Sequence, residues 1–217
     1  MKCTVIAFAA VTGVLCAGSV AAQVYPVKPI RFLVGYAPGG GTDIMARVVA
    51  AKLTDSLGQQ VIVDNRPGAN ANVAAEIASK ASPDGYTVMM ISVSHAISRP
   101  LYRKLGYDLV RDFTPLINIS SVPMFVVVPP SSTAKSVADV VALAKAKSIN
   151  YASSGDGSPE HIAAEMFKGM TGTNMTHVAY KGGAPSALAL ISGEVQLGFN
   201  TAPVAVPHIR SGKMRAI

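Results

Sequence analysis

Residues 30–53 read IRFLVGYAPGGGTDIMARVVAAKL, and the changes of pattern within this stretch decide the fold class. Residues 30–35 form a short apolar run that is typical of a buried strand. Residues 38–43 are a glycine-rich loop, after which apolar residues recur near helical spacing as far as Leu57, and Gly58 ends the predicted helix. A strand, a loop and a helix in this order are the repeating unit of α/β proteins.

The same unit recurs along the chain. The pattern predicts further strands at 61–64, 86–93, 124–128, 150–153, 176–179 and 195–200, with helices at 73–81, 136–147, 160–169 and 185–192. Strands that alternate with helices of these lengths argue for parallel sheets. Two such series suggest two lobes, the first over residues 23–121 and the second over residues 122–217. The uncharged segment 113–134 carries four prolines, which exclude a membrane helix, and it contains the expected crossover.

Residues 1–22 have the parts of a secretory signal peptide. Lys2 is their only charge, residues 5–14 are almost wholly apolar, and small residues follow. We therefore expect export, with a membrane anchor as the alternative interpretation of the apolar run. Both cysteines, Cys3 and Cys16, lie in this leader, so an exported chain would hold no disulfide, thiolate metal site or cysteine nucleophile.

The composition favours a globular protein with an anionic ligand. Half of the 217 residues are hydrophobic and 14% are charged, which is enough apolar surface for a packed core. The formal net charge of +7 would attract an anion. The basic residues are scattered without a dense run, so we do not expect a nucleic-acid partner.

Two glycine-rich loops stand where an open parallel sheet binds its ligands, beyond the C-terminal ends of strands. They are residues 39–43 in the first series and residues 154–158 in the second. Helix starts offer free N–H groups and a partial positive charge, so two facing loops would hold a dicarboxylate at both ends. The plainer alternative is that the glycines only make tight turns and that Asp43 only caps its helix.

Other functions find weaker support. The glycine patterns of nucleotide-binding loops are absent, and Asp43 would repel phosphates. Ser154 or Ser158 near His161 could pair as nucleophile and base, but the chain has no Gly-x-Ser-x-Gly elbow, so a secreted α/β hydrolase stays a minor alternative. We expect no metal and no cofactor, because the histidines show no metal-ligand spacing: His95, His161, His177 and His208.

At these loops the sequence resembles the Bug family of periplasmic receptors, the substrate-binding proteins of tripartite tricarboxylate transporters. The matching segments are YPVKPIR (25–31), PGGGTD (38–43), NRPGA (65–69), PDGY (83–86), ASSG (152–155) and YKG (180–182). The resemblance covers nearly all of residues 23–217. Each motif is modest alone, whereas their order and spacing together are specific.

The resemblance implies a type II periplasmic-binding fold, with two Rossmann-like lobes that close on a ligand without catalysis. It implies a periplasmic monomer that carries a small organic acid to the membrane subunits of a tripartite tricarboxylate transporter. An exported sensor of the same fold, which signals to a membrane receptor, is the alternative. Family members continue well beyond the position of Ile217, so we expect the C-terminal return to the first lobe to be missing here.

The family's ligand-binding loops, carried over position by position, nominate residues on two facing walls. They are Tyr36, Pro38, Gly39, Gly40, Gly41, Thr42, Asp43, Ser94 and His95 on one wall, and Ser154, Gly155, Gly157, Tyr180, Lys181, Asn200 and Thr201 on the other. Two departures stand out. Tyr36 occupies a position where Phe is frequent, and we expect its hydroxyl to contact the ligand. Asn70, Ala71 and Ala74 stand in the stretch where family members often have further glycines.

Overall fold

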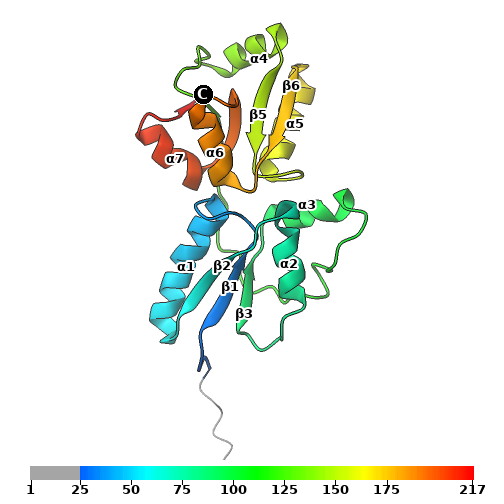
Figure 1. Cartoon of the computed structure of the whole chain (residues 1–217), viewed down its shortest axis with the longest axis vertical. Helices are drawn as coiled ribbons and strands as arrows, with labels where there is room; N and C mark the ends of the chain where they lie inside the picture. The colour runs from blue at the N-terminus through cyan, green and yellow to red at the C-terminus, as the bar shows by residue number, and fades with distance from the viewer. Residues whose placement is uncertain (1–24) are drawn as a thin grey trace, which may run out of the picture.

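The computed structural model describes residues 25–217 as two lobes stacked along the long axis of the molecule (Figure 1). The predicted signal peptide of residues 1–22, with Cys3 and Cys16, lies outside the described residues. Within residues 25–217, no helix has both the length and the hydropathy that crossing a bilayer requires.

The first lobe is built on a parallel three-stranded sheet in the order β2-β1-β3. Its elements are β1 (Ile30–Val34), α1 (Gly41–Leu57), β2 (Val61–Asn65), the short 3-10 turn η1 (Ala69–Ala71), α2 (Asn72–Ser79), β3 (Thr87–Met90) and α3 (Val93–Leu101). Strand β1 lies in the centre, with Ile30 opposite Val61 and Arg31 opposite Thr87. Helix α1 ends at Gly58, whose φ of 67° is the left-handed conformation that glycine adopts easily.

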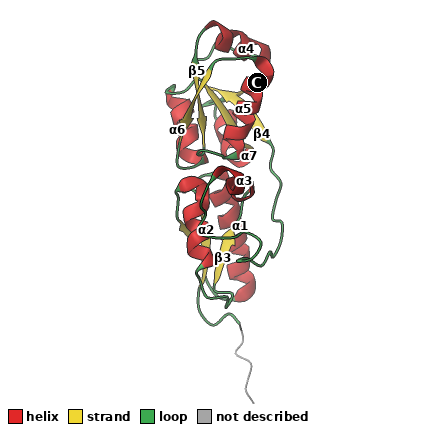
Figure 2. Cartoon of the chain, turned by 90° about the vertical axis from the view of Figure 1, so that its right-hand side faces the viewer, coloured by secondary structure: helices red, strands yellow, loops and turns green. Residues whose placement is uncertain are grey.

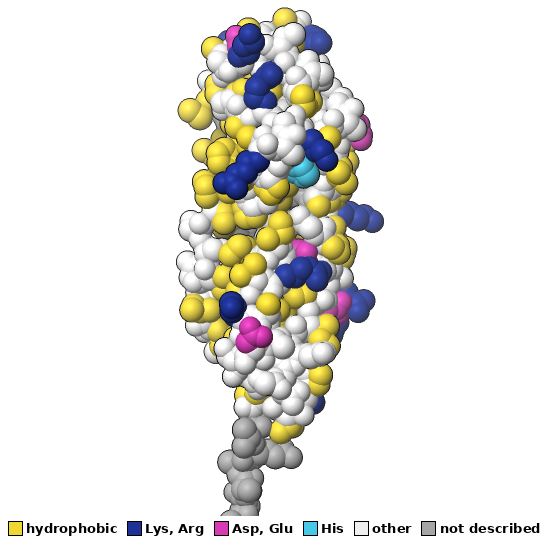
Figure 3. All heavy atoms as spheres, turned by 90° about the vertical axis from the view of Figure 1, so that its left-hand side faces the viewer, with side chains coloured by type: hydrophobic (Ala, Val, Ile, Leu, Met, Phe, Trp, Pro, Cys, Tyr) yellow, Lys and Arg dark blue, Asp and Glu magenta, His cyan; other side chains and the backbone are white. Residues whose placement is uncertain are grey.

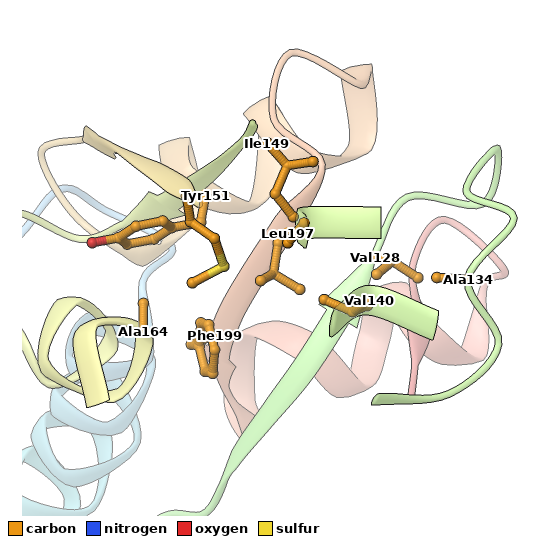
Figure 4. Close-up of a cluster of buried hydrophobic side chains, with 10 residues drawn as sticks. Val128, Ala134, Val140, Ile149, Tyr151, Ala164, Leu197 and Phe199 are labelled. Atoms are coloured by element: carbon orange, nitrogen blue, oxygen red, sulfur yellow. The ribbon is translucent and has the colours of Figure 1, made fainter. Parts of the chain in front are cut away.

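The second lobe is built on a five-stranded sheet in the order β6-β5-β7-β4-β8. Its elements are β4 (Met124–Val128), α4 (Val137–Ala146), β5 (Ile149–Ser153), α5 (Pro159–Thr171), β6 (Met175–Ala179), α6 (Gly183–Ser192), β7 (Leu197–Thr201), α7 (Ala202–Arg210) and β8 (Arg215–Ala216). One of its cores gathers Tyr151, Leu197 and Phe199 under the sheet (Figure 4). Burial of each such side chain stabilises the folded lobe by about 1.5–3 kcal/mol. This packing holds in place the strand ends that carry the site.

The expectation of purely parallel sheets was wrong for this lobe. Strands β5, β6 and β7 are parallel, but β4 runs antiparallel to both β7 and β8. Figure 2 shows that β4 is entered through a long loop that runs up the side of the molecule from the first lobe. Helix α4 then leads to β5, which runs opposite to β4 because β5 is parallel to β7. The alternation of strands and helices therefore did not determine the direction of β4.

The predicted strand at 86–93 was too long, and two helices were not predicted. Strand β3 stops at Met90, and Ser92 begins α3 through a capping box, in which its hydroxyl and the His95 side chain exchange hydrogen bonds with each other's backbone N–H. The continuous apolar run conceals this boundary. Helix α7 contains Pro207 in its interior, which argues against a helix when the sequence is considered alone, whereas Pro203 lies in the first turn, where proline is accepted.

Candidate ligand-binding site

A cavity of about 190 Å³ lies between the two lobes. Its walls come from loops that follow strands, at the positions where α/β sheets bind ligands. The first lobe contributes Gly35, Tyr36, Gly68, Ala69, Asn70, Ala71 and Tyr102, and the second contributes Ser154, Gly155, Asp156, Ala179, Tyr180 and Lys181.

The loop after β2 enters this cavity in an unusual backbone conformation. Ala69, Asn70 and Ala71 have φ values of 46°, 54° and 71°, three left-handed residues in succession, none of them glycine. The left-handed region costs an L-residue roughly 1–2 kcal/mol, and such strain concentrates at functional sites. Gly35 makes room for the loop, because a Cβ there would collide with Ala71.

Asn70 is the most informative side chain of the cavity. It is 7% exposed, its Oδ1 lies 3.5 Å from the Tyr36 hydroxyl oxygen, and its Nδ2 has no partner within residues 25–217. A Cβ placed on Gly157 of the second lobe would lie 3.4 Å from this nitrogen. A buried amide N–H without an acceptor costs about 1–3 kcal/mol, so a bound oxygen atom would be stabilised here.

Tyr36 lies in the cavity wall, but its hydroxyl points into the first lobe. It donates to Ser94 Oγ at 2.6 Å, and burial raises its pKa to about 12, against the opposing effect of hydrogen bonds with Ser92 and Ser94. The network continues through Ser98, which donates to the Ser94 carbonyl. Asn72 Nδ2 then donates to Ser98 Oγ at 3.1 Å. This chain of bonds supports the strained loop from below.

Ser94 and His95, nominated as ligand-binding residues, are fully buried in α3 beneath the cavity wall. His95 Nδ1 accepts the backbone N–H of Ser92 at 3.1 Å. Burial lowers the pKa of His95, although its contacts with the backbone of Ser92 and Ala71 oppose the shift, so the ring is neutral near pH 7. The structure therefore gives both residues a supporting position behind Tyr36.

Asp43 organises the glycine-rich loop after β1. Its buried carboxylate accepts hydrogen bonds from Gly39 N–H (2.8 Å), Arg47 Nε (2.9 Å) and Asn65 Nδ2 (2.9 Å). Burial alone would raise its pKa, but these bonds hold the pKa below its ordinary value. The N-cap residue of α1 is Gly40, which has no side-chain cap, so Asp43 shapes the loop ahead of the helix.

The rest of this loop forms the contact between the lobes and lies beside the cavity. A Cβ on Gly40 would be 3.5 Å from Gly183 N, and a Cβ on Gly41 would be 2.6 Å from Thr201 Oγ1. The beginnings of α1, α6 and α7 therefore meet, and none of the three has a side-chain N-cap. Their partial positive charges reinforce one another and favour an anion nearby.

The loop after β5 forms the opposite wall. Ser154 Oγ donates to Glu160 Oε2 at 2.7 Å, and Ser158 Oγ caps α5 by accepting the backbone N–H of His161. The His161 ring accepts the N–H of Gly157 at its Nδ1 (3.0 Å). Within residues 25–217, neither of these two serine hydroxyls is hydrogen-bonded to an imidazole, so the predicted pairing of Ser154 or Ser158 with His161 is not formed.

The structure divides the nominated residues into groups. Tyr36, Ser154, Gly155, Tyr180 and Lys181 line the cavity; Gly40, Gly41 and Thr201 meet at the contact between the lobes. Gly157 packs against Leu101 and Asn70, and Asn200 is buried at the end of β7. Of the remaining nominated residues, Pro38 and Gly39 are exposed and Thr42 is partly buried, all three outside the cavity lining.

Sequence reasoning missed Gly35, Gly68–Ala71, Tyr102 and Ala179 as parts of the cavity, and it included Asp156 only as a member of the predicted loop 154–158. The Asn-Arg-Pro-Gly turn of residues 65–68 was the available signal for the Gly68–Ala71 loop. No sequence pattern indicated that Tyr102 lies at the cavity, because its position depends on helix α3, which was not predicted.

Comparisons with known proteins agree with this architecture. The family model described as "Tripartite tricarboxylate transporter family receptor" matches residues 45–217. Protein BugT of Bordetella pertussis is 36% identical over 97% of this chain and 65% of its own length. A UPF0065 protein of Bordetella bronchiseptica is 34% identical over 90% of this chain and 59% of its own length. The chain thus spans less than two thirds of these relatives.

Solved structures share the fold. The structure "R. palustris Rpa4515 with adipate" superimposes with a TM-score of 0.86 at 38% identity, over 89% of this chain and 66% of the other. The structure of MatC from Rhodopseudomonas palustris with bound malate gives a TM-score of 0.78 at 27% identity, over 88% of this chain and 66% of the other. Both descriptions name a small organic acid.

Proposed function

The chain belongs to the tripartite tricarboxylate transporter receptor family, and on that premise we propose that it captures a small organic anion, a carboxylate or dicarboxylate, in the cavity between its lobes. It does so in the periplasm as a monomer, without catalysis, and delivers the anion to membrane subunits of the transporter. The nominated residues that line the cavity, together with Asn70, are the proposed contacts.

The unpartnered Nδ2 of Asn70 carries this proposal. A buried amide donor in the wall of a cavity needs an acceptor, and a carboxylate oxygen supplies a charged one. Lys181, also in the lining, adds a positive charge. The meeting of three uncapped helix starts beside the cavity adds a further favourable field.

The size of the cavity supports a small acid. Pockets for drug-sized ligands measure roughly 300–1,000 Å³, whereas this cavity has about 190 Å³. The acids named with two related structures, adipate and malate, are of the size that such a cavity admits. On the face shown in Figure 3, Lys and Arg side chains are spread over both lobes, which suits attraction of a small anion better than a polyanion.

Isothermal titration calorimetry of the full chain against adipate, malate, succinate and citrate tests the proposal. We expect saturable binding of at least one acid. The variant Asn70→Asp keeps the size and the left-handed propensity of the side chain but replaces the donor by a carboxylate, so affinity should fall at least about tenfold. Asn174→Asp, on an exposed residue, is the matched control and should bind like the wild type.

The proposed function would be contradicted if the chain bound none of these four acids and none of their monomethyl esters, which carry one charge fewer. Equal affinity of the wild type and Asn70→Asp would show that the acid does not bind in this cavity.

A further inference from the structure

A carboxylate lines the cavity that is proposed to bind an anion. Among the residues of the cavity wall, Asp156 is the one acidic side chain and Lys181 the one basic side chain. The Asp156 side chain is 78% exposed and brings a carboxylate to the wall. Because like charges repel, its presence is a cost for every anionic ligand, and that cost grows with ligand charge.

Asp156 stands at the meeting point of both lobes. Burial raises the pKa of Tyr102 in the first lobe, and the charge of Asp156 raises it further, so the carboxylate is close to that ring. On its own lobe, Asp156 Oδ1 lies 3.4 Å from His177 Nδ1. The carboxylate therefore lies between the cavity and an imidazole that can offset its charge.

His177 belongs to a stacked cluster that the sheet register assembles. Its ring lies 3.9 Å from that of His161, with 8° between the planes, and 5.0 Å from that of Tyr151. Its Nε2 is 2.6 Å from Ser153 Oγ, which also accepts the N–H of Gly155 in the cavity wall. The protonation of His177 is thus coupled to the wall through both Asp156 and Ser153.

The cluster is poorly arranged for a metal ion, although ligand atoms of Asp156, His161 and His177 lie within 4.8 Å of one another. A metal must lie close to the plane of each imidazole that binds it. Two nearly parallel rings stacked at 3.9 Å cannot both meet that condition without turning. The Nδ1 of His161 is also occupied by the N–H of Gly157.

Burial, more than the neighbouring charges, favours the neutral form of His177 at pH 7. The titratable groups that face it are Tyr151 from β5, Asp156 from the loop after β5, and His161, Glu165 and Lys168 from α5. Burial and the neighbouring His161 lower the pKa of His177, while Asp156 and Glu165 oppose the shift. Near neutral pH the Asp156 charge is therefore not offset by a full positive charge on His177.

We propose that Asp156 is a specificity-determining residue, which makes the cavity favour singly over doubly charged acids and whose effect is relieved when His177 is protonated. This inference rests on the proposed function, because it concerns the charge of the ligand that the same cavity accepts. At neutral pH the ionised Asp156 opposes the second carboxylate of a dianion. At lower pH the His177 imidazolium pairs with Asp156, and the dianion is accepted more readily.

Calorimetry with matched ligands tests the inference. Adipate and succinate are dianions, and their monomethyl esters are monoanions of nearly the same shape. At pH 7.5 we expect Asp156→Asn to tighten binding of the dianions about three- to tenfold and of the monoesters by a smaller factor, as expected for one charge in a partly solvated site. Asp55→Asn, an exposed site on α1, is the control and should change neither.

A pH series from 8 to 5 tests the part played by His177, because its pKa lies below the ordinary value and protonation is reached only in the lower part of this range. Wild-type affinity for the dianions should rise as the pH falls, and His177→Gln, which cannot gain a proton in this range, should give a flatter profile. If the wild type binds at least one dianion and its monoester but Asp156→Asn leaves their affinity ratio unchanged, this inference fails and the proposed function stands. If it binds no acid of either set, both fail.

Discussion

The backbone N–H of Ala37 donates to the carbonyl oxygen of Lys181, with 3.1 Å between the nitrogen and the oxygen. This bond joins the loop after β1 to the loop after β6 and so crosses from one lobe to the other. Lys181, which accepts this bond, lines the cavity, and so does Tyr36, which directly precedes Ala37. The contact between the lobes and the wall of the cavity therefore share the same two loops.

The first prediction concerns the contact that permits closure. Gly41 begins α1 with ordinary helical backbone, and a Cβ there would be 2.6 Å from Thr201 Oγ1. Gly41→Val should leave the folded lobes intact but hold them apart, which weakens ligand affinity at least about tenfold because closure then costs more than about 1.4 kcal/mol. Calorimetry with the tightest-binding acid measures the effect.

A double variant tests the same contact. Thr201→Ala removes the hydroxyl that faces Gly41, so adding it to Gly41→Val should restore part of the lost affinity. Gly169→Val is the control, because a Cβ at Gly169 in α5 meets no atom within 4 Å. Full affinity of Gly41→Val alone would show that this contact is not needed for binding.

The second prediction concerns the close approach of Gly35 and Ala71. Gly35→Ala should lower the free energy of unfolding by about 1–3 kcal/mol, because the new methyl group overlaps Ala71. Ala71→Gly should be neutral or stabilising on its own, since the φ of 71° suits glycine. Urea denaturation of the two single variants and the double variant measures the coupling, and strictly additive effects would contradict the predicted contact.

The third prediction concerns acid sensitivity at Asp43. Its pKa in the folded protein lies below the unfolded value, so the stability that its charge contributes is present above about pH 4 and is lost as pH falls through the folded pKa. At pH 7, Asp43→Asn should be less stable than the wild type by about 2–3 kcal/mol, because hydrogen bonds to a charged acceptor are lost.

Urea denaturation at pH 7, 5, 4 and 3 tests this sign. The difference between wild type and Asp43→Asn should narrow as the pH falls below 4. The exposed variant Asp55→Asn should follow the wild type at every pH. A difference at Asp43 that stays constant from pH 7 to pH 3 would show that the carboxylate charge contributes nothing to stability.

Local patterns in the sequence predicted the architecture well. The run from Ile30 to Gly58 contains its own start and stop signals, and the structure has β1, α1 and the left-handed Gly58 there. Strand β4 was placed correctly, but its antiparallel pairing was not predicted. The direction of a strand depends on which end of the sheet its connection enters, and the residues of β4 and α4 carry no signal for that.

The site was less accessible to sequence reasoning, because its geometry depends on contacts between lobes. Asn70 was noticed only as a departure from glycine, whereas its unpaired amide depends on packing against Gly155 and Gly157. Asp156 and His177 are far apart in sequence, and they meet because Tyr151 lies opposite His177 in the sheet register. The Gly39–Asp43 loop was placed on the cavity wall by analogy, and the structure places its glycines beside the cavity, where the lobes touch.

A crystal structure of the full chain with the acid that binds most tightly in calorimetry is the most direct test of capture between the lobes. The expected result is a carboxylate oxygen about 2.7–3.2 Å from Asn70 Nδ2, with Lys181 and the Gly155 loop on its other side. An acid bound elsewhere, with no ligand atom in contact with Asn70, would contradict the proposed site.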